Sequence, residues 1–169
     1  YNHVNMPGTF NTDSVLIGIG ADLETRSNSK NKVELAIMGD HFKTNHHITK
    51  AADGYQIEIK QKTTENSDIS VSYMQEGKDA LVDRQGIAVQ YWYSQKLPKN
   101  WTVSAGVGPY IADNKLTPNH EGPNSLISFE FKKDTSKDTT VFIRLNRISD
   151  FSGSNDRDIF GVGVSKKFD

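Results

Sequence analysis

Two stretches of the sequence, residues 101–110 and 159–168, place an apolar residue at every second position. The apolar members are Trp101, Val103, Ala105, Val107, Phe160, Val162, Val164 and Phe168, and glycines and a serine supply much of the opposite face. Alternation with a period of two is the pattern of a β-strand that has one apolar face. This pattern limits the chain to a fold built from half-apolar strands.

The same alternation recurs along most of the chain and predicts nine strands. They begin near residues 14, 33, 55, 69, 87, 101, 127, 141 and 159. Residues 1–13 predict an irregular arm, with one short strand around residues 3–6. No stretch has the spacing of an amphipathic helix, so the chain is predicted to be a single all-β domain, 1–169. The preferred architecture is an antiparallel up-and-down β-barrel of 8–10 strands.

Composition excludes several classes of function. A formal charge of −1 with interleaved acids and bases argues against a nucleic-acid binder, and the absence of cysteine excludes disulfides and thiolate chemistry. No apolar run is long enough for a transmembrane helix, although a transmembrane β-barrel remains compatible with this composition. The sequence carries no nucleotide-binding or zinc-protease motif, so we expect no cofactor.

Two barrels share this strand pattern and differ in which face points inward. A soluble lipocalin-like barrel turns its apolar face inward around a small apolar ligand, whereas an outer-membrane barrel turns it toward lipid. Alternating short and long connections, and aromatic residues toward strand ends, favour the membrane barrel. The apolar band predicted from the sequence is roughly 15–20 Å tall, below the usual ~25 Å, so the soluble alternative stays open.

Glycines on the polar face also favour the membrane barrel. Gly18, Gly20, Gly106, Gly108, Gly161 and Gly163 would weaken a solvent-facing strand, but in a narrow lumen they make room for neighbours such as Trp92 and Phe142. Charges on the same face would then need partners across the interior. We therefore predict a polar network in the lumen formed by Glu58, Lys60, Glu76, Gln90, Glu130 and Arg144.

Strand direction raises a question about the count. If the last strand ends on the periplasmic side, the long connections at 43–53, 77–85, 112–124 and 150–158 lie outside. The first strand then runs inward from the outside. An even-numbered barrel would require a further strand from residues 1–13 or from upstream sequence.

The end of the chain resembles known outer-membrane barrels. Phe168, next to last on an alternating strand, looks like the terminal aromatic of such barrels. Residues 144–150, Arg-Leu-Asn-Arg-Ile-Ser-Asp, are similar to the penultimate strand of the lipid A 3-O-deacylase (PagL) family. This resemblance implies the fold and places Ser149 at the family's catalytic serine and Asp150 at its asparagine. Arg147 replaces its histidine, and arginine cannot act as a general base.

A second resemblance involves residues in the middle of the chain. Glu76-Gly77, Arg84-Gln-Gly86 and Gly106-Val-Gly-Pro-Tyr110 look like a group of outer-membrane barrels with no assigned function. Both resemblances imply a bacterial outer-membrane location, with a periplasmic or secreted protein as the alternative. The expected role is a non-catalytic one in envelope structure, adhesion or lipid interaction, with lipid A deacylation as the alternative.

Three further groups of residues are candidates for chemistry. Ser149 is the candidate nucleophile. Charged residues expected in external loops, Asp83, Arg84, Arg147 and Arg157, are candidates for binding membrane lipid or lipopolysaccharide head groups. His41, His46 and His47 lie near Asp40 and Asp53, but their spacing matches no standard metal site, and we predict no metal.

Overall fold

A computed structural model describes residues 12–24, 32–45, 48–50, 54–78, 83–115, 123–149 and 157–168 of the chain. These residues form strands and short turns, and no helix among them is long and apolar enough to cross a membrane. The strands are β1 (Thr12–Glu24), β2 (Lys32–Asn45), β3 (Ile48–Lys50), β4 (Tyr55–Lys62), β5 (Ser67–Lys78), β6 (Asp83–Leu97), β7 (Trp101–Asn114), β8 (Asn124–Asp134), β9 (Thr139–Ser149) and β10 (Arg157–Phe168). The predicted all-β fold is confirmed.

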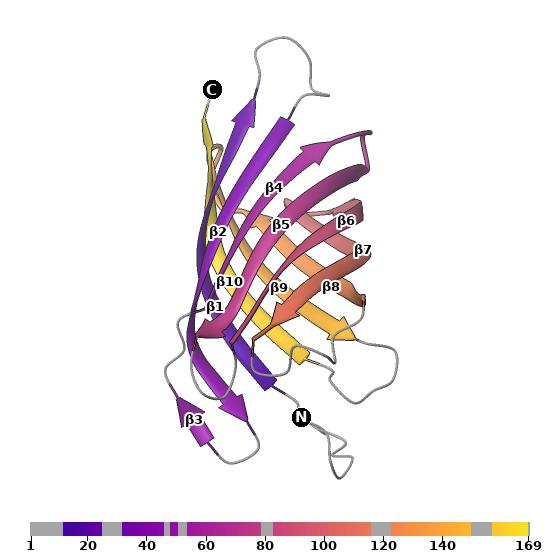
Figure 1. Ribbon diagram of the computed structural model, residues 1–169. Helices are drawn as coiled ribbons and strands as arrows, with labels where there is room; N and C mark the ends of the chain where they lie inside the picture. The colour runs from indigo at the N-terminus through magenta and orange to yellow at the C-terminus, as the bar shows by residue number, and fades with distance from the viewer. Residues whose placement is uncertain are drawn as a thin grey trace.

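The strands belong to one strongly curled sheet (Figure 1). From β4 to β10 each strand pairs antiparallel with the next along the chain, and β2 pairs with β4. β1 pairs antiparallel with β2 on one side and parallel with β10 on the other, from Thr12↔Arg157 to Leu23↔Phe168. The sheet therefore returns on itself as an up-and-down β-barrel.

The parallel pair answers the question of strand number. Nine long strands that alternate in direction cannot close a barrel entirely by antiparallel pairs, because the first and last strands run the same way. β1 and β10 close the sheet as a parallel pair, without a further strand between them. Of the region suggested for that strand, residues 1–13, Thr12 and Asp13 belong to β1, and residues 1–11 lie outside the described part of the chain.

The connections differ between the two ends of the barrel. Residues 63–66, 98–100 and 135–138 form short turns at one end, here called the turn end, where β10 also finishes. The opposite end, here called the loop end, carries the connections 46–54, 79–82, 115–123 and 150–156, and β1 begins there.

Two predicted connections are shorter than expected. Within 43–53, β2 continues to Asn45 and β3 pairs back onto it, because the chain forms a small hairpin there. The charged loop predicted at 77–85 shrinks to 79–82, since β5 runs to Lys78 and β6 begins at Asp83. A register shift between Gln75 and Lys78 accommodates this extension, which carries charged residues into the barrel wall.

The apolar face of the strands points outward. Along β9, Val141, Ile143 and Leu145 are exposed, whereas Phe142, Arg144, Asn146 and Ile148 are buried. Ile57 on β4 is likewise 38% exposed, while its neighbour Glu58 is 1% exposed. The described strands thus place polar residues inside and apolar residues outside, the reverse of the arrangement that a soluble barrel requires.

Candidate functional site: an apolar belt around a filled interior

Large apolar side chains cover the outer wall of the barrel. Each is between 36% and 71% exposed, and together they form what we call the apolar belt: Ile17, Ile19, Tyr55, Ile57, Ile59, Ile69, Val71, Ile87, Val89, Tyr91, Tyr93, Leu97, Trp101, Val107, Ile111, Ile127, Phe129, Phe131, Val141, Ile143, Leu145, Phe160 and Val164. β-Branched and aromatic residues favour extended strands, so the same residues build the sheet and supply its outer surface. Every long strand whose side chains are described contributes to the belt.

Polar residues mark both borders of the apolar belt. At the turn end the outward positions pass to Gln61, Lys133 and Lys166, and at the loop end to Gln75, Gln85, Asp113, Arg147 and Asp158. On β10 the outward positions between Asp158 and Lys166 are apolar. The eight residue steps from Asp158 to Lys166 span about 26 Å along the strand, or roughly 20 Å along the barrel axis at a tilt of about 40°.

Several of the described aromatic residues lie at or near these borders. Trp101 begins β7 at the turn end, and Tyr55 begins β4 at the loop end. The Tyr73 ring is 5.9 Å from the Tyr55 ring, and its hydroxyl donates to Gln85 Oε1 at 3.1 Å, so its polar tip reaches the border. Tyr91 and Phe129 instead lie within the belt, away from both borders.

The interior near the turn end holds a charged cluster that spans the lumen. Arg144 Nη2 lies 2.9 Å from Glu58 Oε1, and its guanidinium also bonds Glu130 Oε2, with Nε at 2.8 Å. Lys60 Nζ lies 3.2 Å from Glu130 Oε1 and 3.7 Å from the centre of the Trp92 ring. These side chains are at most 5% exposed, so each charge is held by an opposite charge rather than by water.

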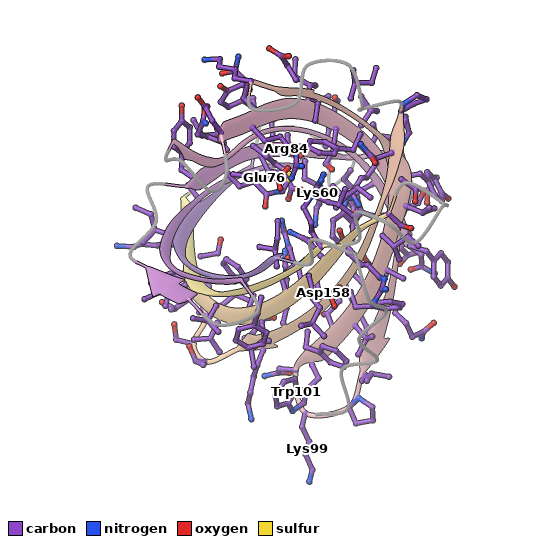
Figure 2. The ribbon with its side chains drawn as sticks, turned by 60° about the horizontal axis from the view of Figure 1, so that its bottom comes forward. Lys60, Glu76, Arg84, Lys99, Trp101 and Asp158 are labelled. Atoms are coloured by element: carbon purple, nitrogen blue, oxygen red, sulfur yellow. The ribbon has the colours of Figure 1, made fainter. Side chains whose placement is uncertain are left out.

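A second charged cluster lies toward the loop end. Glu76 accepts a hydrogen bond from the Tyr110 hydroxyl at 2.6 Å, and Arg84 and Arg157 lie 3.4 Å and 3.0 Å from its Oε2. All four residues are buried, and Figure 2 shows Glu76 and Arg84 inside the ring of strands with Lys60. The six residues predicted to form a lumen network therefore all lie in the interior. Five of them belong to these two charged clusters.

Gln90, the sixth, belongs to a neutral layer between the charged clusters. Its Nε2 donates to Ser128 Oγ at 2.9 Å, Ser128 donates to Asn146 at 2.7 Å, and Asn146 donates to Gln56 at 3.2 Å. Buried apolar residues occupy the space toward the loop end: Met74, Ala88, Tyr110, Leu126, Ile148 and Ile159. Side chains thus fill the described interior, as is usual in barrels of about eight strands.

Two glycines make room for the largest interior rings. A Cβ on Gly106 would lie 2.6 Å from the Trp92 ring, and a Cβ on Gly163 would lie 2.5 Å from the Phe142 ring. Both distances are far below van der Waals contact. These contacts confirm the prediction that glycines on the polar face relieve crowding beside Trp92 and Phe142.

One described cavity, of about 230 Å³, lies at the turn end above the first charged cluster. Its walls are polar and include Lys60, Glu130, Lys62, Lys96, Lys132, Asp134, Thr140 and Ser165. A cavity lined this way suits water or small polar solutes. It does not suit the apolar ligand expected of a lipocalin-like barrel.

Ser149, the candidate nucleophile, ends β9 at the loop end. Its carbonyl accepts a hydrogen bond from Ser125 Oγ at 3.3 Å. Arg147, two residues before it, is 53% exposed and lies 3.5 Å from Asp158. The strand that carries His41 is three strands away around the sheet, about 14 Å, so the described part of the chain assembles no serine–histidine pair.

The four head-group candidates separate into two pairs. Asp83 and Arg147 point outward near the loop-end border, as expected of residues that meet head groups. Arg84 and Arg157 were expected in external loops, and this placement is wrong. Both lie on strands with side chains 8% and 2% exposed, because the inward alternation continues to these positions and Glu76 binds both guanidiniums.

The predicted histidine group and its acidic neighbours lie outside the described side chains. Among the side chains that are described, no three histidine or acidic groups are placed to hold a metal ion. Asp150, matched above to an asparagine of the deacylase family, also lies outside the described residues. No protein-family model, curated protein or solved structure matches this chain.

Proposed function

We propose that this protein is a small integral β-barrel of the bacterial outer membrane, with its apolar belt in contact with lipid. The observation that carries the proposal is that the belt covers every long strand whose side chains are described and has polar borders on both sides. Soluble monomers rarely expose contiguous apolar patches of more than a few hundred Å². A partner protein would cover one side of such a barrel, whereas a bilayer covers every side at one height.

The dimensions of the belt support this environment. Its height of roughly 20 Å between charged residues is close to the ~25 Å apolar band of outer-membrane barrels. Trp101 at one border and Tyr55 at the other occupy the positions of interfacial aromatic residues. In the orientation that we propose, the turn end faces the periplasm and the loop end faces outward.

The filled interior supports a role other than transport. On the strands whose side chains are described, the charged clusters, the neutral layer and the buried apolar residues occupy successive levels of the lumen along the barrel axis. We therefore propose a non-catalytic role in envelope structure, adhesion or lipid interaction. Arg147 and Asp83, just beyond the loop-end border, are then placed at the level of lipopolysaccharide head groups.

The chain contains two tryptophans that test the proposal directly. Trp101 is 38% exposed on the outer wall, whereas Trp92 is 0% exposed in the interior. Trp92→Phe leaves Trp101 as the only tryptophan, and Trp101→Phe leaves Trp92. Each variant is reconstituted into vesicles that contain phosphatidylcholine brominated either near the head group or deep in the acyl chain.

We expect brominated lipid to quench Trp101 strongly and Trp92 weakly. Shallow bromines should quench Trp101 more than deep ones, because it lies at the border of the belt. A folded, monodisperse protein that needs no detergent, with Trp101 unaffected by either lipid, would refute the membrane location. Equal quenching of both tryptophans would show that the interior is not closed to lipid.

A further inference from the structure

Trp101 and Lys133 form a pair at the turn-end border of the apolar belt. They are register partners on β7 and β8, and Lys133 Nζ lies 4.8 Å from the centre of the Trp101 ring. The outward neighbours of Lys133 on the sheet are apolar, with Phe131 two residues earlier and Val141 paired across β9. No described carboxylate pairs with the Lys133 ammonium group.

Lys99 adds a second cation beside this pair. It lies in the turn between β6 and β7, and its backbone is in the left-handed region at φ 63°. The backbone amide of Asp134 donates to the carbonyl of Asn100 at 3.1 Å, which holds this turn against the end of β8, next to Lys133. Figure 2 shows Lys99 and Trp101 together outside the ring of strands.

The acid next to Lys133 in the sequence does not neutralise these lysines. Asp134 follows Lys133 on the strand, so its side chain points to the opposite, inward face. There it accepts a hydrogen bond from Thr140 at 2.5 Å and borders the polar cavity. Two ammonium groups and an indole therefore stand at the edge of an apolar surface without a described anion.

The described part of the turn end has the same sign of charge. Its described side chains include more lysines than carboxylates: Lys62, Lys96, Lys99, Lys132, Lys133, Lys137 and Lys166 against Glu65, Asp68, Asp134 and Asp138. Cations near a membrane surface attract anionic lipids and are screened by salt. A lysine held over an indole at the head-group level presents its charge where a lipid phosphate lies.

We infer that Lys99, Trp101 and Lys133 form a head-group site for an anionic phospholipid in the leaflet at the turn end. The lipid phosphate accepts hydrogen bonds from the two ammonium groups, and its acyl chains lie along Trp101, Phe131 and Val141. This inference rests on the proposed membrane location. It adds a lipid class and a side of the membrane, neither of which the belt alone defines.

The test uses Trp101 as its own probe in the Trp92→Phe protein. Vesicles of phosphatidylcholine carry a small, equal fraction of either brominated phosphatidylglycerol or brominated phosphatidylcholine. We expect brominated phosphatidylglycerol to occupy the site up to about thirtyfold more often than its mole fraction predicts, which corresponds to two lysines at about 1 kcal/mol each. Lys133→Gln and Lys99→Asn should each lower this preference, and the double substitution should abolish it.

Lys115→Gln is the matched control, because Lys115 is an exposed lysine at the loop end. It should leave the preference unchanged. Equal quenching by the two brominated lipids would overturn the inference while leaving the membrane location intact. Absence of quenching by either lipid would overturn both. A loss of preference in Lys115→Gln as large as in Lys133→Gln would show a diffuse charge effect and overturn the site.

A second measurement covers the case in which Trp92→Phe fails to fold. The wild-type protein in neutral detergent is given equal amounts of the two lipids, and retained lipid is counted by native mass spectrometry. Retention of phosphatidylglycerol that depends on Lys99 and Lys133 supports the site. Equal retention of both lipids by wild-type protein overturns it.

Discussion

Gly106 lies directly opposite Trp92 on neighbouring strands, and a Cβ at position 106 would stand 2.6 Å from the indole ring. The indole also stacks against Lys60 and donates to Ser70 Oγ at 2.9 Å, so it is held in place from other sides. Because Gly106 has no Cβ, the Trp92 ring has room to lie inside this barrel.

Gly106→Ala should destabilise the barrel by about 1–3 kcal/mol, because the added methyl group must displace a ring that cannot move freely. Urea unfolding of reconstituted protein measures this change. In the Trp92→Phe background the same alanine should cost much less, since the smaller ring leaves room. Equal costs in the two backgrounds would show that the indole is not what excludes the methyl group.

We predict that removing Arg144 lowers the free energy of unfolding more than removing any other member of the first charged cluster. Arg144→Met leaves the Glu58 carboxylate without its 2.9 Å partner in a site that is 1% exposed, and we expect a loss of about 3–5 kcal/mol. Adding Glu58→Gln removes the uncompensated charge and should recover a large part of the loss. Unfolding free energies of the single and double variants measure the coupling. Additive losses would argue against a direct Arg144–Glu58 interaction.

The strands, and the division of each strand into an apolar and a polar face, could be read from the sequence because each strand carries its own period-two alternation. The alternation does not show which face points inward, and that direction was predicted from connection lengths, aromatic positions and glycines. The pairs of side chains that contact each other in the interior could not be read from the sequence. Lys60 meets Glu130 and Gln56 meets Asn146 across the lumen, at separations of 70 and 90 residues. Strand tilt and register determine such contacts, and neither is visible in the alternation. The parallel closure of β1 on β10 also depends on pairing rather than on local pattern.

Some interior residues left a signal that sequence reasoning did not use. Near the loop end the strands still alternate between inward and outward positions, but the charged residues now point outward and the apolar residues point inward. On β9, Arg147 takes an outward position and Ile148 an inward one. The same exchange occurs on β10 with Asp158 outside and Ile159 inside. This exchange marks where the apolar belt ends and the buried apolar residues of the lumen begin. It would have placed Arg157 inside the barrel.

The filled interior predicts that the protein does not form an open pore. Leu126 and Tyr110, the latter a member of the second charged cluster, are both 0% exposed, and they pack with Met74 and Ile148. Liposomes that contain the protein should not swell in isotonic arabinose, and planar bilayers should show no steady conductance. A general porin reconstituted in parallel supplies the positive control. Reproducible conductance would mean that these side chains move away from the barrel axis when the protein is in a membrane.

Ser149 tests the resemblance to lipid A deacylases. We expect no hydroxy fatty acid to be released from lipid A, because Arg147 pairs with Asp158 where that family has its histidine base. Mass spectrometry of the lipid after incubation is the measurement. Release that is abolished by Ser149→Ala but retained by Ser125→Ala would establish hydrolysis and refute the non-catalytic role.

Lys99 separates stability from lipid binding. Its φ of 63° is unfavourable for a lysine, so Lys99→Gly or Lys99→Asn should stabilise the barrel by up to about 1 kcal/mol. Lys137, in the turn between β8 and β9, has no positive φ, and Lys137→Gly should give no such gain. Urea unfolding distinguishes the two lysines. If Lys99→Asn stabilises the fold while weakening the preference for phosphatidylglycerol, the weaker lipid binding cannot be attributed to a damaged structure. Destabilisation by Lys99→Gly would instead mean that the lysine side chain supports the turn through contacts of its own.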